Sequence, residues 1–138
     1  VVFLVDTNVW IEHLLAQERA EEAASFLTRT ASDTICISAF SLHSICLIMA
    51  RLKAREKLLE FIEDVIVGAE VQVATIEPAD LPLVLAAMSA QRLDFDDAYQ
   101  FVVAQQRGLV LVSFDRDFDH SDLARLTPAQ ALAKWPPV

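Results

Sequence analysis

The sequence predicts an α/β fold in which helices cover both faces of a central parallel sheet, as a three-layer α/β/α sandwich. Short apolar runs alternate with longer helical patterns along the chain, an order typical of parallel strands joined by crossover helices. The first run, 1–5, and the last, 109–112, carry no charge and are rich in β-branched residues. Such runs indicate strands that are buried on both faces.

Length and composition fit one domain spanning residues 1–138. The chain is 54% hydrophobic with two glycines, which favours a compact globule with a sizeable core. No apolar run approaches the roughly 18 residues of a membrane span, and the N-terminus does not resemble a signal peptide. We therefore expect a cytoplasmic protein with no membrane segment, and we expect Cys36 and Cys46 to be small buried hydrophobes.

Helices and strands are predicted from hydrophobic periodicity and from the residues that start and stop helices. Asn8 and Ser41 are expected to be N-caps, Pro78 and Pro128 to open helices, and Gly68 and Gly108 to close them. Strands are predicted at 1–5, 34–37, 71–76 and 109–112, and helices at 9–16, 20–30, 42–50, 58–66, 78–91, 94–106 and from 128 onward.

The helix predicted at 42–50 is apolar on almost every side, interrupted only by His43 and Ser44. A helix of this kind is buried on more than one side. Packing within the domain accounts for one side, and we interpret the other as a homodimer interface, with His43 packed within the domain or at that interface.

Acidic side chains follow the first and the last predicted strand along the chain. Asp6 comes directly after the first strand, and Asp115 and Asp117 come shortly after the last. Ligands of open α/β sheets gather at the carboxyl ends of the strands. The sequence therefore predicts one acidic pocket at this edge.

The helix that starts near Asp94 supplies a further acid. Neighbouring residues on a helix point about 100° apart, so Asp96 and Asp97 face different ways. Asp97 has apolar residues at i+4 and i+7, whereas Asp96 has Gln100 at i+4. We therefore assign Asp97 to the pocket and place Asp96 with Gln100 on the polar side.

A pocket of carboxylates selects a hard cation, Mg²⁺ or Mn²⁺. The net charge of −9 argues against nucleic-acid binding by a basic patch, but a bound metal can bring phosphate to an acidic site. Acids at strand ends also occur in phosphotransfer receivers and in phosphatases with an aspartyl nucleophile. A receiver is disfavoured because Ser38, not an acid, ends the middle strand and no Lys directly follows the last strand at Val112.

Three motifs together resemble the PIN domain, and in length and order of elements the chain looks like a VapC-type toxin of toxin–antitoxin pairs. They are Asp6-Thr7-Asn8, Asp97-Ala98, and the segment 113–118, Ser-Phe-Asp-Arg-Asp-Phe. The resemblance implies a Mg²⁺- or Mn²⁺-dependent endoribonuclease that cuts RNA with metal-activated water, forms homodimers and is inhibited by a cognate antitoxin.

Residue by residue, the resemblance implies that Asp6, Asp97 and Asp115 are catalytic metal ligands and that Asp117 is an additional ligand. Asn8, Ser44 and Ser113 are then candidates for the second shell or for substrate contacts.

The second motif departs from the family pattern, because Ser44 stands where the family commonly has Glu. A hydroxyl can hold water but brings no negative charge, so metal binding should be weaker unless Glu12, His43 or Asp96 compensates. Two hypotheses follow: an active ribonuclease, or a catalytically weakened PIN-like protein that acts by binding protein or RNA.

Overall fold

The structure is a computed structural model that describes residues 1–138, and it contains one five-stranded parallel sheet. The strands lie in the order β3-β2-β1-β4-β5, so β1 is central. The chain runs outward from β1 to β3 on one side and then returns to place β4 on the other side of β1. The space between the ends of β1 and β4 is therefore the topological switch point, where open α/β sheets bind ligands. The strands are β1 (Phe3–Val5), β2 (Ile35–Ser38), β3 (Gln72–Ala74), β4 (Val110–Val112) and β5 (Arg125–Leu126).

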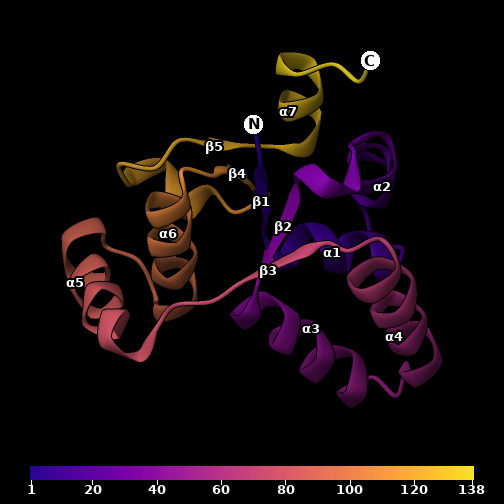
Figure 1. Cartoon of the computed structure of the whole chain (residues 1–138), viewed down its shortest axis with the longest axis horizontal. Helices are drawn as coiled ribbons and strands as arrows, with labels where there is room; N and C mark the ends of the chain where they lie inside the picture. The colour runs from indigo at the N-terminus through magenta and orange to yellow at the C-terminus, as the bar shows by residue number, and fades with distance from the viewer.

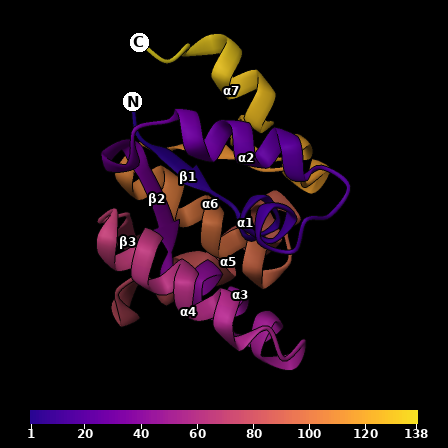
Figure 2. The same ribbon diagram turned by 90° about the vertical axis from the view of Figure 1, so that its right-hand side faces the viewer.

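Seven α-helices cover both faces of the sheet, which confirms the three-layer prediction (Figures 1 and 2). Successive strand residues point to opposite faces: Leu4 and Leu111 pack into the core with α5 and α6. Phe3 and Val5 pack into a second core with α1, α2, α4 and α7. The helices are α1 (Thr7–Leu14), α2 (Ala20–Arg29), α3 (Ala39–Arg51), α4 (Arg55–Phe61), α5 (Leu81–Gln91), α6 (Phe95–Arg107) and α7 (Pro128–Lys134).

Two helices begin earlier than the sequence suggested. Asp6, not Asn8, caps α1, and its side chain accepts a hydrogen bond from the Thr7 backbone N–H. Ser38, not Ser41, caps α3, and its hydroxyl accepts from the backbone N–H of Ser41. In both places the chain enters the helix directly from the strand. The polar residue predicted to be a cap lies instead within the first turn of the helix, where its side chain is free to face the strand ends.

Three further predictions need correction. Helix α4 continues into a π-helical segment, Ile62–Gly68, and Gly68 is not a left-handed cap because Gly108 is the only glycine with positive φ. A 3₁₀ turn, Pro78–Asp80, precedes α5. The edge strand β5 was missed because it has only two residues, one of them charged, which is too short for a periodicity to show.

The apolar helix α3 is buried on one side only within this chain. Ile45 and Met49 are buried, whereas Leu47 is 52% exposed and His43 is also exposed. Nearby apolar side chains of Leu52 and Leu59 are exposed as well. The second side of α3 therefore contributes to an open apolar surface. Of the two cysteines, Cys36 is buried as expected and Cys46 is half-buried. None of the helices combines the length and the apolar composition that a membrane span requires.

Candidate metal centre

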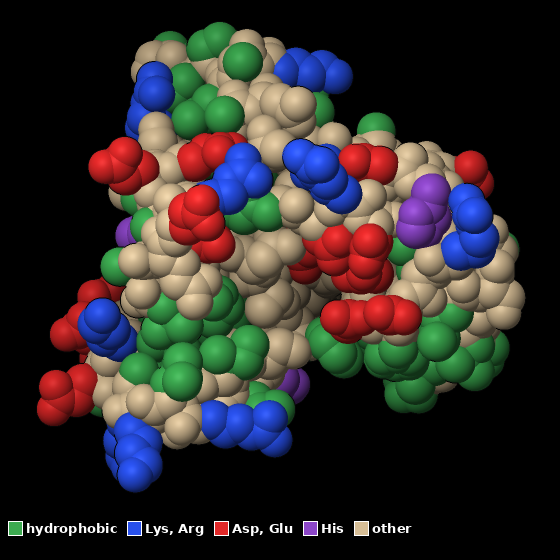
Figure 3. Space-filling model, turned by 180° about the vertical axis from the view of Figure 1, so that it is seen from behind, with side chains coloured by type: hydrophobic (Ala, Val, Ile, Leu, Met, Phe, Trp, Pro, Cys, Tyr) green, Lys and Arg blue, Asp and Glu red, His purple; other side chains and the backbone are tan.

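A polar cleft of about 370 Å³ opens at the carboxyl ends of β1 and β4. In the view from behind, acidic side chains gather beside a hollow between the α3–α4 side and the α5–α6 side of the molecule (Figure 3). Three groups of residues line the cleft: the end of β1 and start of α1, one face of α3, and the first turns of α6 with Asp115. They are Asp6, Thr7, Asn8, Ile11, Phe40, Ser41, Ser44, Ile48, Asp96, Asp97, Gln100 and Asp115.

Asp6 lies at the base of this cleft and is 6% exposed. Its Oδ1 accepts hydrogen bonds from the Thr7 N–H and from Gln100 Nε2, each at 2.9 Å. Its Oδ2 accepts from the Ser113 hydroxyl at 2.7 Å and from Asn8 Nδ2 at 3.4 Å. Burial raises the pKa of Asp6, while the bonds from Ser113, Gln100 and Thr7 oppose that rise. The donors thus hold a carboxylate in a place that would otherwise favour its protonated form.

Asn8 and Ser113 join the ends of β1 and β4 directly. Asn8 Nδ2 donates to Ser113 Oγ at 3.2 Å, and Asn8 Oδ1 accepts from the backbone N–H of Phe114 at 3.1 Å. Ser113 Oγ also accepts from the backbone N–H of Asp115 at 3.0 Å. Both residues therefore lie behind the acids and fix the turn that presents Asp115.

Asp97 enters the cleft from the first turn of α6 and is 7% exposed. Desolvation and the neighbouring charges of Asp96, Asp115, Asp6 and Asp117 raise its pKa to about 8. A helix N-terminus ordinarily stabilises a carboxylate by a fraction of a kcal/mol up to about 2 kcal/mol. That effect is outweighed here, because four other acids surround a poorly hydrated group. A carboxyl of this kind is stabilised as an anion when a cation binds beside it.

Asp115 and Asp117 complete an acidic cluster with Asp97. One ligand oxygen from each of the three lies within 4.8 Å of the others. The turn itself fixes Asp115, because its Oδ1 accepts from the backbone N–H of Asp117 at 2.8 Å. The three residues offer only hard oxygen ligands, and the pKa of Asp97 is raised. They therefore fit a divalent cation of the Mg²⁺ or Mn²⁺ type.

Ser44 lines the cleft from α3, and no residue of α3 brings a carboxylate there. Of the three residues considered as substitutes, only Asp96 lines the cleft. Glu12 is engaged elsewhere, since its Oε2 accepts from the backbone N–H of Arg19 at 3.0 Å. His43 is exposed and does not line the cleft.

Sequence reasoning missed three polar residues of this site: Gln100, Ser41 and Thr7. Gln100 was assigned to a polar helix side with Asp96, but it is 2% exposed. Ser41 is fully buried and accepts from both Thr7 Oγ1 and Gln100 Nε2. The available signal was the run 98–104, where Gln100 is the only amide among aliphatic and aromatic residues.

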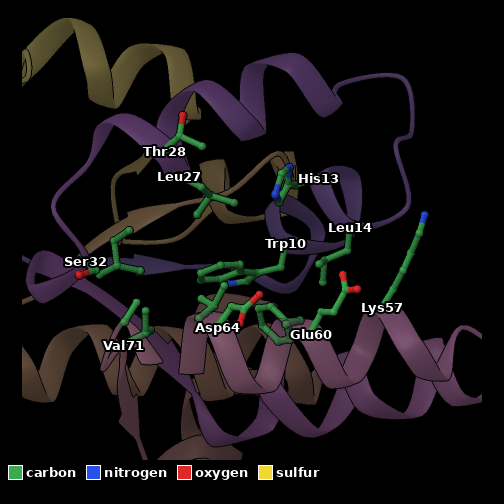
Figure 4. A pocket seen from close by; sticks show the side chains of 14 residues that line it. Trp10, His13, Leu14, Leu27, Thr28, Ser32, Lys57, Glu60, Asp64 and Val71 are labelled. Atoms are coloured by element: carbon green, nitrogen blue, oxygen red, sulfur yellow. The ribbon is translucent and has the colours of Figure 1, made fainter. Parts of the chain in front are cut away.

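A second hollow of about 430 Å³ lies away from the acids, between α1, α2 and α4 with the π-helical segment (Figure 4). Trp10 forms part of its wall, and its indole N–H donates to the Val5 carbonyl. The lining is mainly apolar, with Lys57, Glu60 and Asp64 among its polar members. Its two acids, Glu60 and Asp64, belong to no group of three possible metal ligands, so we do not assign the reaction centre there.

The fold and the cleft together define a class of protein: an α/β domain that presents clustered carboxylates at the switch point of a parallel sheet. The model of the PIN domain family matches residues 3–123. The chain therefore belongs to the PIN domain family. A search of curated proteins gave no match.

Several solved structures share this fold. FitAcB from Neisseria gonorrhoeae is 24% identical, with a TM-score of 0.75 over 93% of this chain and 99% of that chain. VapC20 of Mycobacterium tuberculosis, a sarcin–ricin loop cleaving toxin, is 18% identical, with a TM-score of 0.74 over 91% and 99%. A toxin–antitoxin complex from Klebsiella pneumoniae is 21% identical, with a TM-score of 0.70 over 91% and 97%. At these identities the likeness shows the fold.

Proposed function

We propose that residues 1–138 form a single-domain, Mg²⁺- or Mn²⁺-dependent endoribonuclease, the toxin of a toxin–antitoxin pair that acts in the cytoplasm. The observation that carries this proposal is the convergence of Asp97, Asp115 and Asp117 within 4.8 Å beside Asp6 at the switch point. Membership in the PIN family supports hydrolysis of a phosphodiester bond as the reaction.

Asp6, Asp97, Asp115 and Asp117 would hold the cation. The last three converge within 4.8 Å of one another, and Asp6 lines the same cleft as Asp97 and Asp115. A bound Mg²⁺ or Mn²⁺ supplies a more acidic water and stabilises negative charge at phosphorus. Binding also favours the ionised form of Asp97, whose pKa is about 8 without it. Asn8 and Ser113 keep Asp6 and Asp115 in place through their hydrogen bonds.

The cleft also accounts for how an acidic protein would receive RNA. A net charge of −9 repels the phosphate backbone at long range. Neutralisation of the acidic cluster by a cation removes the strongest local part of that repulsion. We therefore expect both RNA binding and cleavage to depend on the divalent ion.

A weakened PIN-like binding module is the second candidate, and Ser44 is the observation that favours it. Without a carboxylate from α3, the cleft contains fewer negative ligands on that side. Such a protein would bind RNA or protein in the same cleft while cleaving slowly.

A protein partner and a second copy of the chain complete the proposal. The structural neighbours include a toxin–antitoxin complex from Klebsiella pneumoniae, which supports a cognate antitoxin as partner. Exposed apolar side chains on α3 and α5 are available for a homodimer, among them Leu47 at 52% and Leu85 at 58% exposure. Light scattering of the purified chain tests the dimer, and a monomer at micromolar concentration would contradict it.

The decisive test of the function is cleavage of structured RNA by the purified chain in Mn²⁺, with Asp97→Asn as the matched inactive variant. We expect internal cuts by the wild type that disappear in Asp97→Asn and in EDTA. Metal and RNA binding without cleavage would instead support the second candidate. Equal cleavage by the two proteins would indicate a contaminating nuclease and contradict the assignment.

A further inference from the structure

Gln100 is a buried amide in the wall of the acidic cleft. It lies on α6 one turn after Asp97 and is 2% exposed. All other residues of the run 98–104 are aliphatic or aromatic, and they belong to the core between the sheet and helices α5 and α6. A polar side chain at such a place requires a physical reason, because desolvating an amide costs free energy unless its hydrogen bonds are replaced.

The amide nitrogen of Gln100 has two partners. Nε2 donates to Asp6 Oδ1 at 2.9 Å and to Ser41 Oγ at 2.9 Å. These contacts fix the orientation of the amide, because the opposite orientation would place its carbonyl oxygen against a carboxylate oxygen. Gln100 therefore joins three elements at one point: α6, the end of β1 and the start of α3.

The amide oxygen has no partner. Oε1 of Gln100 is the one buried side-chain polar atom in the chain without a hydrogen bond. Leaving such an acceptor unpaired destabilises the folded state, because its hydration is lost and not replaced. A methionine has similar length and flexibility and would fill the same space without this cost. Stability of the fold alone therefore does not explain an amide at position 100.

The bond to Asp6 suggests the reason. The other donors to Asp6 come from its own turn and from Ser113 after β4. Gln100 supplies the only hydrogen bond between Asp6 and α6, the helix that carries Asp97. Gln100 thus fixes Asp6 relative to the helix that carries Asp97. Its N–H also stabilises the negative charge on Asp6, which the neighbouring acids destabilise.

We propose that Gln100 is a positioning residue for the divalent-metal centre, which holds the Asp6 carboxylate and couples it to α6 and to Ser41 of α3. This inference rests on the proposed metal-dependent function. It assigns Gln100 no contact with substrate or metal. Through its hydrogen bond to Ser41, the neutral amide of Gln100 makes an ordered polar contact with α3. On this side of the cleft Ser44 supplies no carboxylate.

The test compares Mn²⁺ binding by calorimetry for the wild type, Gln100→Met and Gln105→Met. Gln105 is on the same helix but exposed, so its variant makes the same chemical change away from the cleft. Loss of residues that orient metal ligands typically weakens metal affinity by about 10- to 100-fold. We expect a loss in that range for Gln100→Met and none for Gln105→Met.

Thermal unfolding in EDTA gives a readout that a merely structural role would move differently. Gln100→Met removes the unpaired Oε1 but also the hydrogen bonds to Asp6 and Ser41. Because these two effects oppose each other, we expect its Tm without metal to stay close to that of the wild type. A lower Tm together with unchanged Mn²⁺ affinity would show that Gln100 only supports the fold and would overturn the inference. Should Gln100→Met not fold, Gln100→Ala, which cannot clash, is measured in the same way with the same expectation for Mn²⁺ affinity.

Calorimetry separates the role of Gln100 from the existence of the metal centre. If the wild type binds Mn²⁺ and Gln100→Met binds it with equal affinity, the proposed role of Gln100 is wrong, while the metal centre is still supported. No binding by the wild type at millimolar Mn²⁺ overturns the metal centre itself, and the inference about Gln100 with it.

Discussion

Asp97 shows at the scale of one residue how burial and charge prepare a site for a cation. Its carboxyl is 7% exposed and is surrounded by Asp96, Asp115, Asp6 and Asp117, which together with desolvation raise its pKa to about 8. An unfolded aspartate loses its proton near pH 3.8. Between these two values the metal-free native protein holds a proton that the unfolded chain has released.

That difference fixes the sign of a stability change. Where the native state binds more protons than the unfolded state, stability falls as pH rises. The metal-free protein should therefore lose stability from about pH 4 to pH 8. Asp97→Asn, which has no proton to lose, should be more stable than the wild type at pH 8 by several kcal/mol, since each unit of pKa shift corresponds to about 1.4 kcal/mol. Urea unfolding in EDTA at pH 5.5 and pH 8 measures this.

Asp96→Asn is the matched control for Asp97→Asn, because it removes the adjacent but exposed carboxyl. Surface changes usually alter stability by less than about 0.5 kcal/mol. A wild-type stability that increases between pH 5.5 and pH 8, with no gain in Asp97→Asn, would show that Asp97 is ionised in the metal-free protein.

Ser44 gives a second prediction at this scale. The variant Ser44→Glu places a carboxylate on the α3 wall of the cleft, and we expect Mn²⁺ to bind about tenfold more tightly because an additional anionic ligand raises affinity. Ser44→Gln has the same length without the charge and should not increase affinity. Calorimetry on both variants measures the effect. Equal affinity in Ser44→Glu and the wild type would mean that another group, with Asp96 the nearest candidate, already fills that role.

Helix α6 is the element that links core and site. One side carries Asp97 and Gln100 at i and i+3, while the rest of the segment to Ala104 packs in the core. The helix ends at Gly108, whose φ is +63°. A left-handed conformation at this point lets the chain turn at once into β4, so the helix end sets the position of the strand that leads to Asp115.

Gly108→Ala tests that cap. No atom lies within 4 Å of the added Cβ, so the change acts only through the backbone, and an L-residue in the left-handed region costs about 1 kcal/mol. Chemical unfolding should show that loss. Gly108→Asn is the control, since asparagine tolerates this conformation better, and it should lose less. A larger loss for Asn than for Ala would argue that space and not backbone conformation limits the position.

At the scale of the whole molecule, the metal centre joins parts of the chain that are far apart in sequence. Asp6 follows the central strand, Asp97 lies on a helix of one outer layer, and Asp115 follows β4. A cation held by residues of several elements binds the native state and not the unfolded chain, so it should stabilise the entire fold.

Thermal unfolding with and without Mn²⁺ measures that stabilisation. At a free Mn²⁺ concentration 100 times its Kd, the free energy of unfolding should rise by about 2.7 kcal/mol, and EDTA should reverse the increase in Tm. Asp97→Asn should show no such shift. An equal shift in this variant would place the stabilising ion outside the acidic cleft.

The strands differ in how well their sequences predict them. The uncharged, β-branched strands β1 and β4 were predictable because both their faces are buried. The edge strand β5 was not, since Arg125 and Leu126 are too few to form a pattern. Asp6, Asp97 and Asp115 line one cleft, as expected from acids at strand ends and from the apolar stripe beside Asp97.

The sequence by itself determined the α/β class, the family motifs and three of the acids that line the cleft, Asp6, Asp97 and Asp115, because local periodicity and the rule of strand ends require no knowledge of long-range pairing. The tertiary structure alone decided the place of Gln100, whose partner Asp6 lies 94 positions away in the chain. The two meet only because the strand order puts β1 at the centre of the sheet, beside β4. Helical periodicity pairs Gln100 with Asp96, but the hydrogen bonds to Asp6 and Ser41 hold it in the interior.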